Sequence, residues 1–253
     1  MENKFVVIST CYEKGKWVGF NINSIKQQSY TNFTAIYGYD KSSDNTLQYI
    51  ENNIKDDSRF TLFNNPNPGC FLKNFYGCVN YLKDNNLIND EDIVVEVDGD
   101  DWLLHPFVFE YLNNVYQNPE IWMTYGQYIE YPKGNVGGHY NLELNSLVDV
   151  NNSYRTHVFP YSHLKTYKFK LLDKIPQESL INPETGEYFK AAADFALTMP
   201  MVEMAGMGRI HRIPEPIYVY NLSEDANNES IHQVQSQKQQ EQLIRQIPPS
   251  KRL

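Results

Sequence analysis

Cysteine is scarce in this sequence, and its pattern excludes small domains held together by disulfides or zinc. Only three cysteines occur, Cys11, Cys70 and Cys78, and no two of them have the spacing of a zinc-binding pair. An odd number of cysteines argues against a disulfide framework and is typical of a reducing compartment. We therefore expect a cytoplasmic protein. The abundance of Asn, Lys, Ile, Tyr and Phe is typical of coding in AT-rich bacterial or viral genomes. For a viral protein the expected compartment is the host cytoplasm.

Long apolar runs and an excess of positive charge are also missing. No apolar stretch is long enough to cross a bilayer, and residues 1–10 lack the charged and apolar regions of a signal peptide. Lys and Arg number 22 against 31 Asp and Glu, which gives a formal charge of -9 and argues against non-specific binding to nucleic acid. Gly-rich phosphate loops and fixed-period repeats are absent as well.

Alternating strand and helix patterns fill residues 1–101. The chain has 253 residues and is 41% hydrophobic, which is enough for one substantial core and a single α/β domain. β-branched and aromatic runs predict strands, and apolar residues at helical spacing between them predict helices. This alternation is the signature of a mostly parallel sheet. The predicted strands are 5–9, 33–39, 60–63 and 93–97, and the predicted helices are 17–28, 47–54 and 71–82.

The pattern changes after residue 102. The sequence predicts a helix from 105 that ends near 118–119, a strand over 123–129, a helix over 160–172 and an aromatic strand over 217–220. Residues 133–154 are rich in Asn and Gly and have little periodicity, which predicts a long surface loop of the kind that often serves as a lid. The polar, Gln-rich residues from 223 predict a surface helix or a partly disordered tail.

Three carboxylates at the end of the fourth predicted strand carry the strongest chemical signal. Asp98, Asp100 and Asp101 follow the run 93–97 at the carboxyl end of the strand, where open α/β sheets bind ligands. Carboxylates so close together repel one another, and a hard divalent ion, which prefers oxygen ligands, relieves the repulsion. Our working hypothesis is that these carboxylates hold a metal against the diphosphate of a nucleotide.

Turn and capping chemistry is an alternative for the same cluster. Asp accepts hydrogen bonds from backbone amides, so Asp101 can cap a helix that opens at Trp102. The cluster alone leaves the metal and the turn equally open. An EF-hand is excluded, because Phe109 stands at the twelfth loop position, where that site needs Glu.

Four segments carry a resemblance to a known family. They are Val6-Val7-Ile8-Ser9-Thr10-Cys11-Tyr12, Tyr39-Asp40-Lys41-Ser42-Ser43-Asp44-Asn45-Thr46, Asp98-Gly99-Asp100-Asp101 and Ala193-Asp194-Phe195-Ala196. In this order they resemble the opening strand, the acidic turn, the DXD metal motif and the catalytic-base segment of the inverting glycosyltransferases of family 2. Each motif is weak alone, but four in the right order are fairly specific. The likeness spans roughly residues 5–221.

The resemblance implies a GT-A fold, a Rossmann-like α/β/α sandwich with a mostly parallel sheet. It implies a metal-dependent glycosyltransferase of hexosyltransferase type, with Mn²⁺ or Mg²⁺ as cofactor. The sugar would pass from a nucleotide-sugar, usually a UDP-sugar, to a hydroxyl of a glycan, lipid or protein acceptor. The resemblance also implies roles for single residues. Thr10 and Tyr12 would line the uridine, Asp40 would bind the uracil ring, and Lys73 would be a basic donor contact. Asp98 and Gly99 would lie at the ribose or metal shell, Asp98 and Asp100 would bind the metal, and Asp194 would be the general base.

Each of these residues also has a plainer interpretation. Asp40 can be a turn residue before a capped helix, Tyr12 can serve packing, and Lys73 can be a solvated helix lysine. Asp194 follows three alanines and can cap a helix. A base separate from the metal nevertheless suits the chemistry, because an acceptor hydroxyl is a poor nucleophile until its proton is removed on the side away from the nucleotide.

One departure concerns the third metal ligand. Many relatives place a His directly after the last strand, but here Asn221-Leu222-Ser223 follows Tyr220, and His232 is the nearest downstream candidate. We expect one domain over 1–253, with a nucleotide-sugar-binding half (1–101), an acceptor-binding half (102–221) and a polar tail (222–253). The aromatic-rich second half allows a homodimer.

Two rival functions remain. A sugar-nucleotide nucleotidyltransferase shares the sheet type but needs a Gly-rich, basic loop after the first strand, which residues 10–17 do not provide. A non-catalytic carbohydrate-binding or scaffold protein would have a decayed site, whereas acids are present at all three motif positions.

Overall fold

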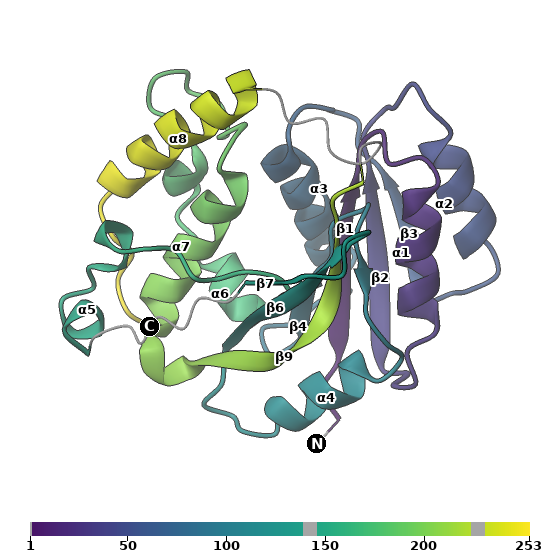
Figure 1. The fold of residues 1–253 in the computed structure, drawn as a ribbon, viewed down its shortest axis with the longest axis horizontal. Helices are drawn as coiled ribbons and strands as arrows, with labels where there is room; N and C mark the ends of the chain where they lie inside the picture. Colours follow the sequence, from purple (N-terminus) through teal and green to yellow (C-terminus); the bar gives the residue numbers. More distant parts are fainter. Residues whose placement is uncertain (1, 139–145, 224–230) are drawn as a thin grey trace.

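A mixed β-sheet forms the centre of the structure, a computed structural model that describes residues 2–138, 146–223 and 231–253 (Figure 1). The strands are β1 (Phe5–Cys11), β2 (Phe33–Tyr39), β3 (Phe60–Asn64), β4 (Ile93–Glu96), β5 (Trp102–Leu103), β6 (Met123–Tyr131), β7 (Val136–Gly137), β8 (Lys165–Lys168) and β9 (Ile210–Asn221). Within the described residues they lie in the order β3-β2-β1-β4-β8-β6-β9-β5, and β7 pairs with β6. The strands from β3 to β4 are parallel, as are β6 and β9, whereas β8 runs antiparallel to β4 and β6. The predicted mostly parallel α/β sheet is confirmed.

Helices cover both faces of this sheet. They are α1 (Trp17–Lys26), α2 (Thr46–Ile54), α3 (Phe71–Asp84), α4 (Val108–Val115), α5 (Ser146–Val150), α6 (Phe169–Asp173), α7 (Ala193–Ala205) and α8 (Ile231–Gln246). Successive side chains of a strand point to opposite faces. Accordingly, Phe5 and Val7 of β1 belong to one cluster with α1, α2 and α4, and Val6 and Ile8 belong to another with α3 and α7. No helix in the described part of the chain is long and apolar enough to cross a membrane.

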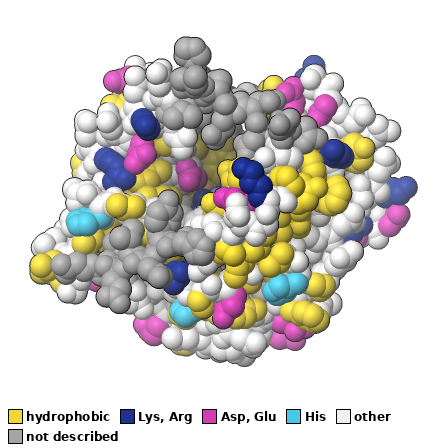
Figure 2. All heavy atoms as spheres, viewed as in Figure 1, with side chains coloured by type: hydrophobic (Ala, Val, Ile, Leu, Met, Phe, Trp, Pro, Cys, Tyr) yellow, Lys and Arg dark blue, Asp and Glu magenta, His cyan; other side chains and the backbone are white. Residues whose placement is uncertain are grey.

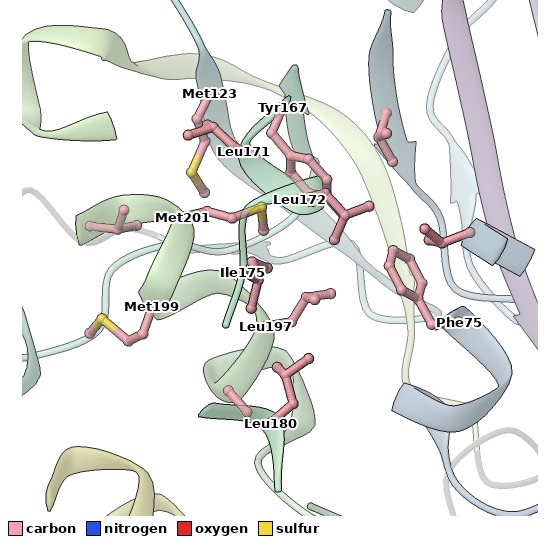
Figure 3. Packing of buried hydrophobic residues seen from close by; sticks show 14 of the residues in the cluster. Phe75, Met123, Tyr167, Leu171, Leu172, Ile175, Leu180, Leu197, Met199 and Met201 are labelled. Carbon is pink, nitrogen blue, oxygen red and sulfur yellow. The ribbon is translucent and has the colours of Figure 1, made fainter. Parts of the chain in front are cut away.

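The helix α7 lies inside the hydrophobic cluster that contains Val6 and Ile8, and it is buried along most of its length. Residues 195–205 are all buried, which is typical of a helix that is apolar around its whole circumference. Figure 3 shows Leu197, Met199 and Met201 of this helix in one cluster with Phe75 of α3 and Tyr167 of β8. Asp194, which is exposed in the first turn of α7, is therefore held in place by the buried remainder of the helix.

The helix predicted over 160–172 is wrong. Residues Lys165–Lys168 form β8, and only Phe169–Asp173 is helical, as α6. The apolar residues Leu164, Tyr167 and Leu171 have helical spacing, but β8 lies between β4 and β6 and gains backbone hydrogen bonds on both edges. Pairing within the sheet outweighs the local helical pattern.

Several boundaries also differ from the predicted ones. The last strand begins at Ile210 rather than 217, because irregular pairing with β6 accommodates Pro214 and Pro216. The helix predicted from 105 begins at Val108. In the predicted lid loop 133–154, β7 and α5 occupy the two ends, and residues 139–145 lie outside the described residues. The predicted polar tail contains α8, and residues 224–230 of that tail also lie outside the described residues.

A buried ion pair fastens the C-terminal residues to α7. Arg155 donates from Nε and Nη2 to the two carboxylate oxygens of Glu203, at 2.5 and 2.9 Å. Its Nη1 donates to the carbonyl of Ile244 in α8 at 2.7 Å, and the N–H of Ser250 donates to Glu203 at 2.8 Å. The side chains of Arg155 and Glu203 are 5% and 0% exposed, so each charge depends on the other in place of water.

Replacement of Arg155 by methionine should lower the free energy of unfolding by roughly 3–5 kcal/mol, because Glu203 is then buried without a cation. Urea unfolding followed by circular dichroism measures the loss. The double variant Arg155→Met/Glu203→Gln removes both charges and should recover much of the stability. Equal losses in the single and double variants would contradict a role for the ion pair.

Candidate active site

The carboxyl ends of β1, β2 and β4 open into a pocket of about 580 Å³. This is the edge at which α/β sheets bind ligands. Figure 2 shows side chains of both charges near the middle of one face of the molecule, and a broad group of hydrophobic side chains beside them. The predicted residues that line the pocket are Thr10, Tyr12, Asp40, Asp98, Gly99 and Asp100.

Two of these residues sit at opposite extremes of exposure. Asp40 is buried, and its carboxylate accepts hydrogen bonds from Asn65 Nδ2 at 2.6 Å and from the N–H of Gly69 at 3.2 Å. These donors fix the carboxylate at the end of β2. Tyr12 is 57% exposed at the pocket, so a ring there has room to contact a ligand.

Lys14 is the pocket residue that the sequence analysis missed. Its Nζ lies 2.7 Å from Oδ2 of Asp100. Burial lowers the pKa of Lys14, but the attraction of Asp100 outweighs it, so the pKa is raised and the amine stays protonated. The available signal was its place just after the carboxyl end of β1, only four residues after Thr10. The pocket therefore contains a cation as well as carboxylates.

Asp101 also lines this pocket, and its carboxylate is held by β9. Its Oδ2 accepts from the hydroxyl of Tyr218 at 2.7 Å, and its Oδ1 accepts from the N–H of Asn221 at 2.8 Å. Burial and the neighbouring carboxylates raise its pKa well above the usual value. The alternative in which Asp101 caps a helix at Trp102 is wrong, since β5 begins there. Both Asp101 oxygens accept hydrogen bonds from β9, which favours Asp98 and Asp100 among the three carboxylates of the working hypothesis.

Asp98 and Asp100 remain as the candidate metal ligands. Burial raises the pKa of both carboxyls, so a nearby cation would stabilise their ionised forms. Among the described residues, no three His, Cys, Asp or Glu side chains converge as a complete metal site, and the side chain of His232 lies outside them. Two carboxylates fit a Mg²⁺ or Mn²⁺ ion whose remaining ligands are phosphate and water oxygens.

A second pocket, of about 250 Å³, adjoins the first. Both are lined by Phe71, Asp98 and Tyr220, so they meet at the tip of β4. Asp194 lines the second pocket from the first turn of α7 and is exposed. The structure thus brings Asp98 and Asp194 to the lining of one pocket, and Asp98 and Asp100 to the lining of its neighbour.

A buried lysine lies between these carboxylates. Lys165 of β8 pairs with Glu96 of β4 at 3.2 Å, their side chains are 1% and 4% exposed, and both residues line the second pocket. Burial lowers the pKa of Lys165, but the carboxylates of Glu96, Asp194 and Asp98 outweigh it and raise the pKa. The sequence signal was Glu96 itself, since a charge inside a buried strand needs a partner. Lys165 is therefore an ammonium surrounded by acids.

His163 forms another wall of the second pocket. Its ring stacks on Tyr218 and Tyr220, with centroid separations of 5.0 and 5.4 Å. Burial, and then the charge of Lys165, lower the pKa of this histidine to about 3. The imidazole is neutral at physiological pH, so it contributes a polar surface without charge.

Lys73 does not join the other predicted donor contacts. It is exposed on α3 and lines a separate pocket of about 390 Å³ with Asn67 and Tyr188. Its aliphatic chain lies near Gly69. The structure thus places Lys73 beside the loop that holds Asp40, outside the pocket that contains the carboxylates.

Gly99 has no room for a side chain. A Cβ at this position would lie 2.7 Å from Sγ of Cys11 and 2.8 Å from the carbonyl oxygen of Thr10. Gly99→Ala should therefore displace the tips of β1 and β4 and cost about 1–3 kcal/mol of stability, with weaker nucleotide binding. Thermal unfolding and a nucleotide titration measure the two effects. Gly208→Ala, with open space around the Cβ and no left-handed backbone, serves as the surface comparison. Wild-type binding by Gly99→Ala would show that the strand tips can adapt.

The chain is similar to known glycosyltransferases in sequence and in fold. A family model described as glycosyl transferase family 2 matches residues 6–176. No curated protein sequence matches the chain. The similar solved structures share little sequence identity with it, so they show the fold alone.

Three of these structures give the scale of the likeness. Residues 1–349 of S. aureus TarS superpose with a TM-score of 0.64 at 19% identity, over 92% of this chain and 69% of that one. Glucosyl-3-phosphoglycerate synthase of Mycobacterium tuberculosis gives 0.59 at 14% identity, over 98% and 82% of the two chains. The mannosyltransferase PcManGT of Pyrobaculum calidifontis gives 0.56 at 16% identity, over 88% and 58%. These proteins share the mixed α/β arrangement with a curled, mostly parallel sheet.

Proposed function

The chain belongs to glycosyl transferase family 2, with the GT-A fold, and from this premise we propose that it is a metal-dependent, inverting glycosyltransferase acting on a UDP-sugar. The observation that carries the proposal is the meeting of two pockets at Asp98. One pocket holds Asp100 and Lys14, and the other holds an exposed acid, Asp194. A donor and an acceptor would each have one pocket, with the reacting atoms between them.

We propose that the first pocket binds the nucleotide. Asp40, held by Asn65 and Gly69, would accept a hydrogen bond from a ring N–H of the base, and Thr10 and Tyr12 would line the uridine. UDP is supported by the neighbours, since structures of TarS contain UDP-GlcNAc or UDP, and one of the mycobacterial synthase contains UDP and Mn²⁺. The mannosyltransferase contains GDP-mannose and Mn²⁺ instead.

Asp98 and Asp100 would hold the divalent cation, with Gly99 allowing the close approach of the strand tips. A bound Mn²⁺ or Mg²⁺ supplies a Lewis acid that offsets the charge of the leaving diphosphate. Lys14, 2.7 Å from Asp100, is placed to add a second positive charge on the same side. These residues would bind and orient the diphosphate without taking part in proton transfer.

Asp194 would act as the general base from the second pocket. It would accept the proton of an acceptor hydroxyl, which then attacks the sugar from the side opposite the diphosphate. A single attack of this kind inverts the configuration at the sugar carbon. The second pocket offers no other exposed acid on α7 among the described residues, so one base would serve one displacement.

The division of the chain follows the two pockets. We propose that residues 1–101 bind the donor, that residues 102–221 supply most of the acceptor side, and that the tail 222–253 completes it. The acceptor would be a hydroxyl of a glycan, a lipid-linked sugar or a protein. A cytoplasmic location is part of the proposal, and it is supported by the three cysteines, all of which are unpaired.

A screen of UDP-, GDP- and TDP-sugars for hydrolysis with and without Mn²⁺ tests the proposal. Metal-dependent release of UDP from one sugar nucleotide is the expected result. A scaffold protein would show no metal-dependent binding of UDP by calorimetry. A nucleotidyltransferase would release pyrophosphate from UTP and a sugar phosphate, and this result would replace the proposal.

A further inference from the structure

The polar helix α8 lies against α7 near the second pocket (Figure 1). Its sequence is rich in glutamine and reads as a surface helix. Two of its glutamines nevertheless reach the functional region. Gln237 lines the second pocket, and Gln240 contacts the loop that leads into α7. This helix therefore has a polar contact with the site in addition to its packing.

The contact of Gln240 is made with backbone alone. Its Oε1 accepts from the N–H groups of Lys190 and Ala191, both at 3.0 Å. Its Nε2 donates to Oγ of Ser236 at 3.0 Å, so the amide oxygen is directed at the loop. One side-chain oxygen thus bridges two successive backbone donors just before the helix starts.

The loop at this point needs an outside support. Ala192, the residue before α7, has φ of 52°, a left-handed conformation that costs free energy in a residue with a Cβ. No side chain caps the N-terminus of α7. Asp194 follows two residues later in the first turn, so the direction of its carboxylate depends on how the chain enters the helix.

The helix that carries Gln240 is itself held firmly. Ile244 is fully buried, and its carbonyl accepts from Arg155 at 2.7 Å. Arg245 lies over the ring of Phe195 in α7, 4.7 Å from the ring centroid. Gln240 therefore joins the loop to a helix that is itself fixed in place.

We propose that Gln240 is a positioning residue that holds the 190–192 loop so that Asp194 faces the acceptor hydroxyl. This inference rests on the proposed role of Asp194 as the general base. The helix α8 would then support the acceptor pocket, and the polar tail would contribute to the rate of transfer. The substrate contact remains that of Asp194, and Gln240 acts through the backbone.

The test compares Gln240→Met with Gln240→Glu. Methionine has nearly the same length and helix propensity but removes the acceptor oxygen, whereas glutamate keeps one. Lys190 is exposed and Ala191 is partly exposed, so water can replace the lost hydrogen bonds and the melting temperature should hold. We expect kcat for sugar transfer to fall between roughly 10-fold and 100-fold in Gln240→Met, because a catalytic group displaced by about 1 Å costs that much. The Kd for UDP with Mn²⁺ should not change.

Two comparisons make the result decisive. Gln240→Glu should restore kcat to within about threefold of wild type, since its carboxylate can accept both N–H groups. Gln239→Met makes the same chemical change at the exposed neighbouring position and should leave kcat unchanged. A fall in kcat shared by both methionine variants, or a fall in UDP affinity in Gln240→Met, would overturn the inference.

Failure of this inference is distinguishable from failure of the proposed function. A wild-type protein that transfers no sugar, or an Asp194→Asn variant with full transfer, overturns the proposed function. A wild type whose transfer depends on Asp194, together with full activity in Gln240→Met, overturns the role of Gln240 alone. If Gln240→Met melts at a lower temperature, the kcat of Gln240→Glu decides. A restored kcat in Gln240→Glu still supports the inference, whereas a kcat as low as that of Gln240→Met refutes the inference.

Discussion

Asp194→Asn should abolish sugar transfer while leaving the affinity for UDP intact. The amide is nearly isosteric with the carboxylate but cannot accept the proton of an acceptor hydroxyl, and a general base typically contributes 10²–10⁴-fold to the rate. Asp194 lines the second pocket, whereas the proposed nucleotide contacts line the first. Initial rates of transfer and calorimetry with UDP and Mn²⁺ measure the two properties separately.

Glu187→Gln provides a matched control for this prediction. Glu187 is an exposed acid in the segment before α7, and it pairs with Lys190 rather than lining either pocket. Its loss should not change the rate. If Asp194→Asn weakened UDP binding and Glu187→Gln did not, Asp194 would belong to the donor side, and another residue would have to act as base.

Asp100→Ala should remove most of the activity and most of the dependence of UDP affinity on Mn²⁺. Asp100 supplies one of only two carboxylates proposed for the cation, so the remaining site is a single carboxylate with ligand oxygens. The measurement is the ratio of the Kd values for UDP with and without Mn²⁺, alongside the rate of transfer. For the variant, this ratio should approach one.

The variant Lys14→Met distinguishes the effect of the metal on UDP binding from the effect of the lysine that contacts the same carboxylate. Lys14 is 2.7 Å from Asp100, so its removal should weaken UDP binding in general through the loss of a positive charge. The ratio of Kd values with and without Mn²⁺ should nevertheless stay at the wild-type level or rise. Unchanged turnover in Asp100→Ala, or loss of the Mn²⁺ effect in Lys14→Met alone, would rule out the proposed metal role of Asp100.

Patterns local in the sequence predicted the donor half of the fold. The strands β1, β2 and β4 are β-branched or aromatic runs buried on both faces, so their signal is strong. The order of β1 to β4 follows from short crossovers. The strand β8 was missed because two lysines and a threonine fill it. Its identity depends on its neighbours β4 and β6, which are distant in the sequence.

The same distinction separates the residues of the site that were predicted from those that were missed. Asp40, Asp98 and Asp100 follow strands directly, so the rule for the carboxyl ends of parallel strands places them. Lys165 and Gln240 reach the second pocket only because β8 and α8 return to it from later parts of the chain. Asp101 belongs to the motif in sequence, yet its partners Tyr218 and Asn221 were visible only in the fold.

The anchoring of β9 by Asp101 has a consequence for how the protein is made. The parallel strands β3, β2, β1 and β4 are joined by local crossovers, so this half of the sheet can form while later residues are still being synthesised. The pocket wall at Tyr220 and Asn221, and the support at Gln240, are added only after these later residues have left the ribosome. We therefore expect translation intermediates that contain every acidic motif up to Asp101, but not these later residues, to be unable to consume donor.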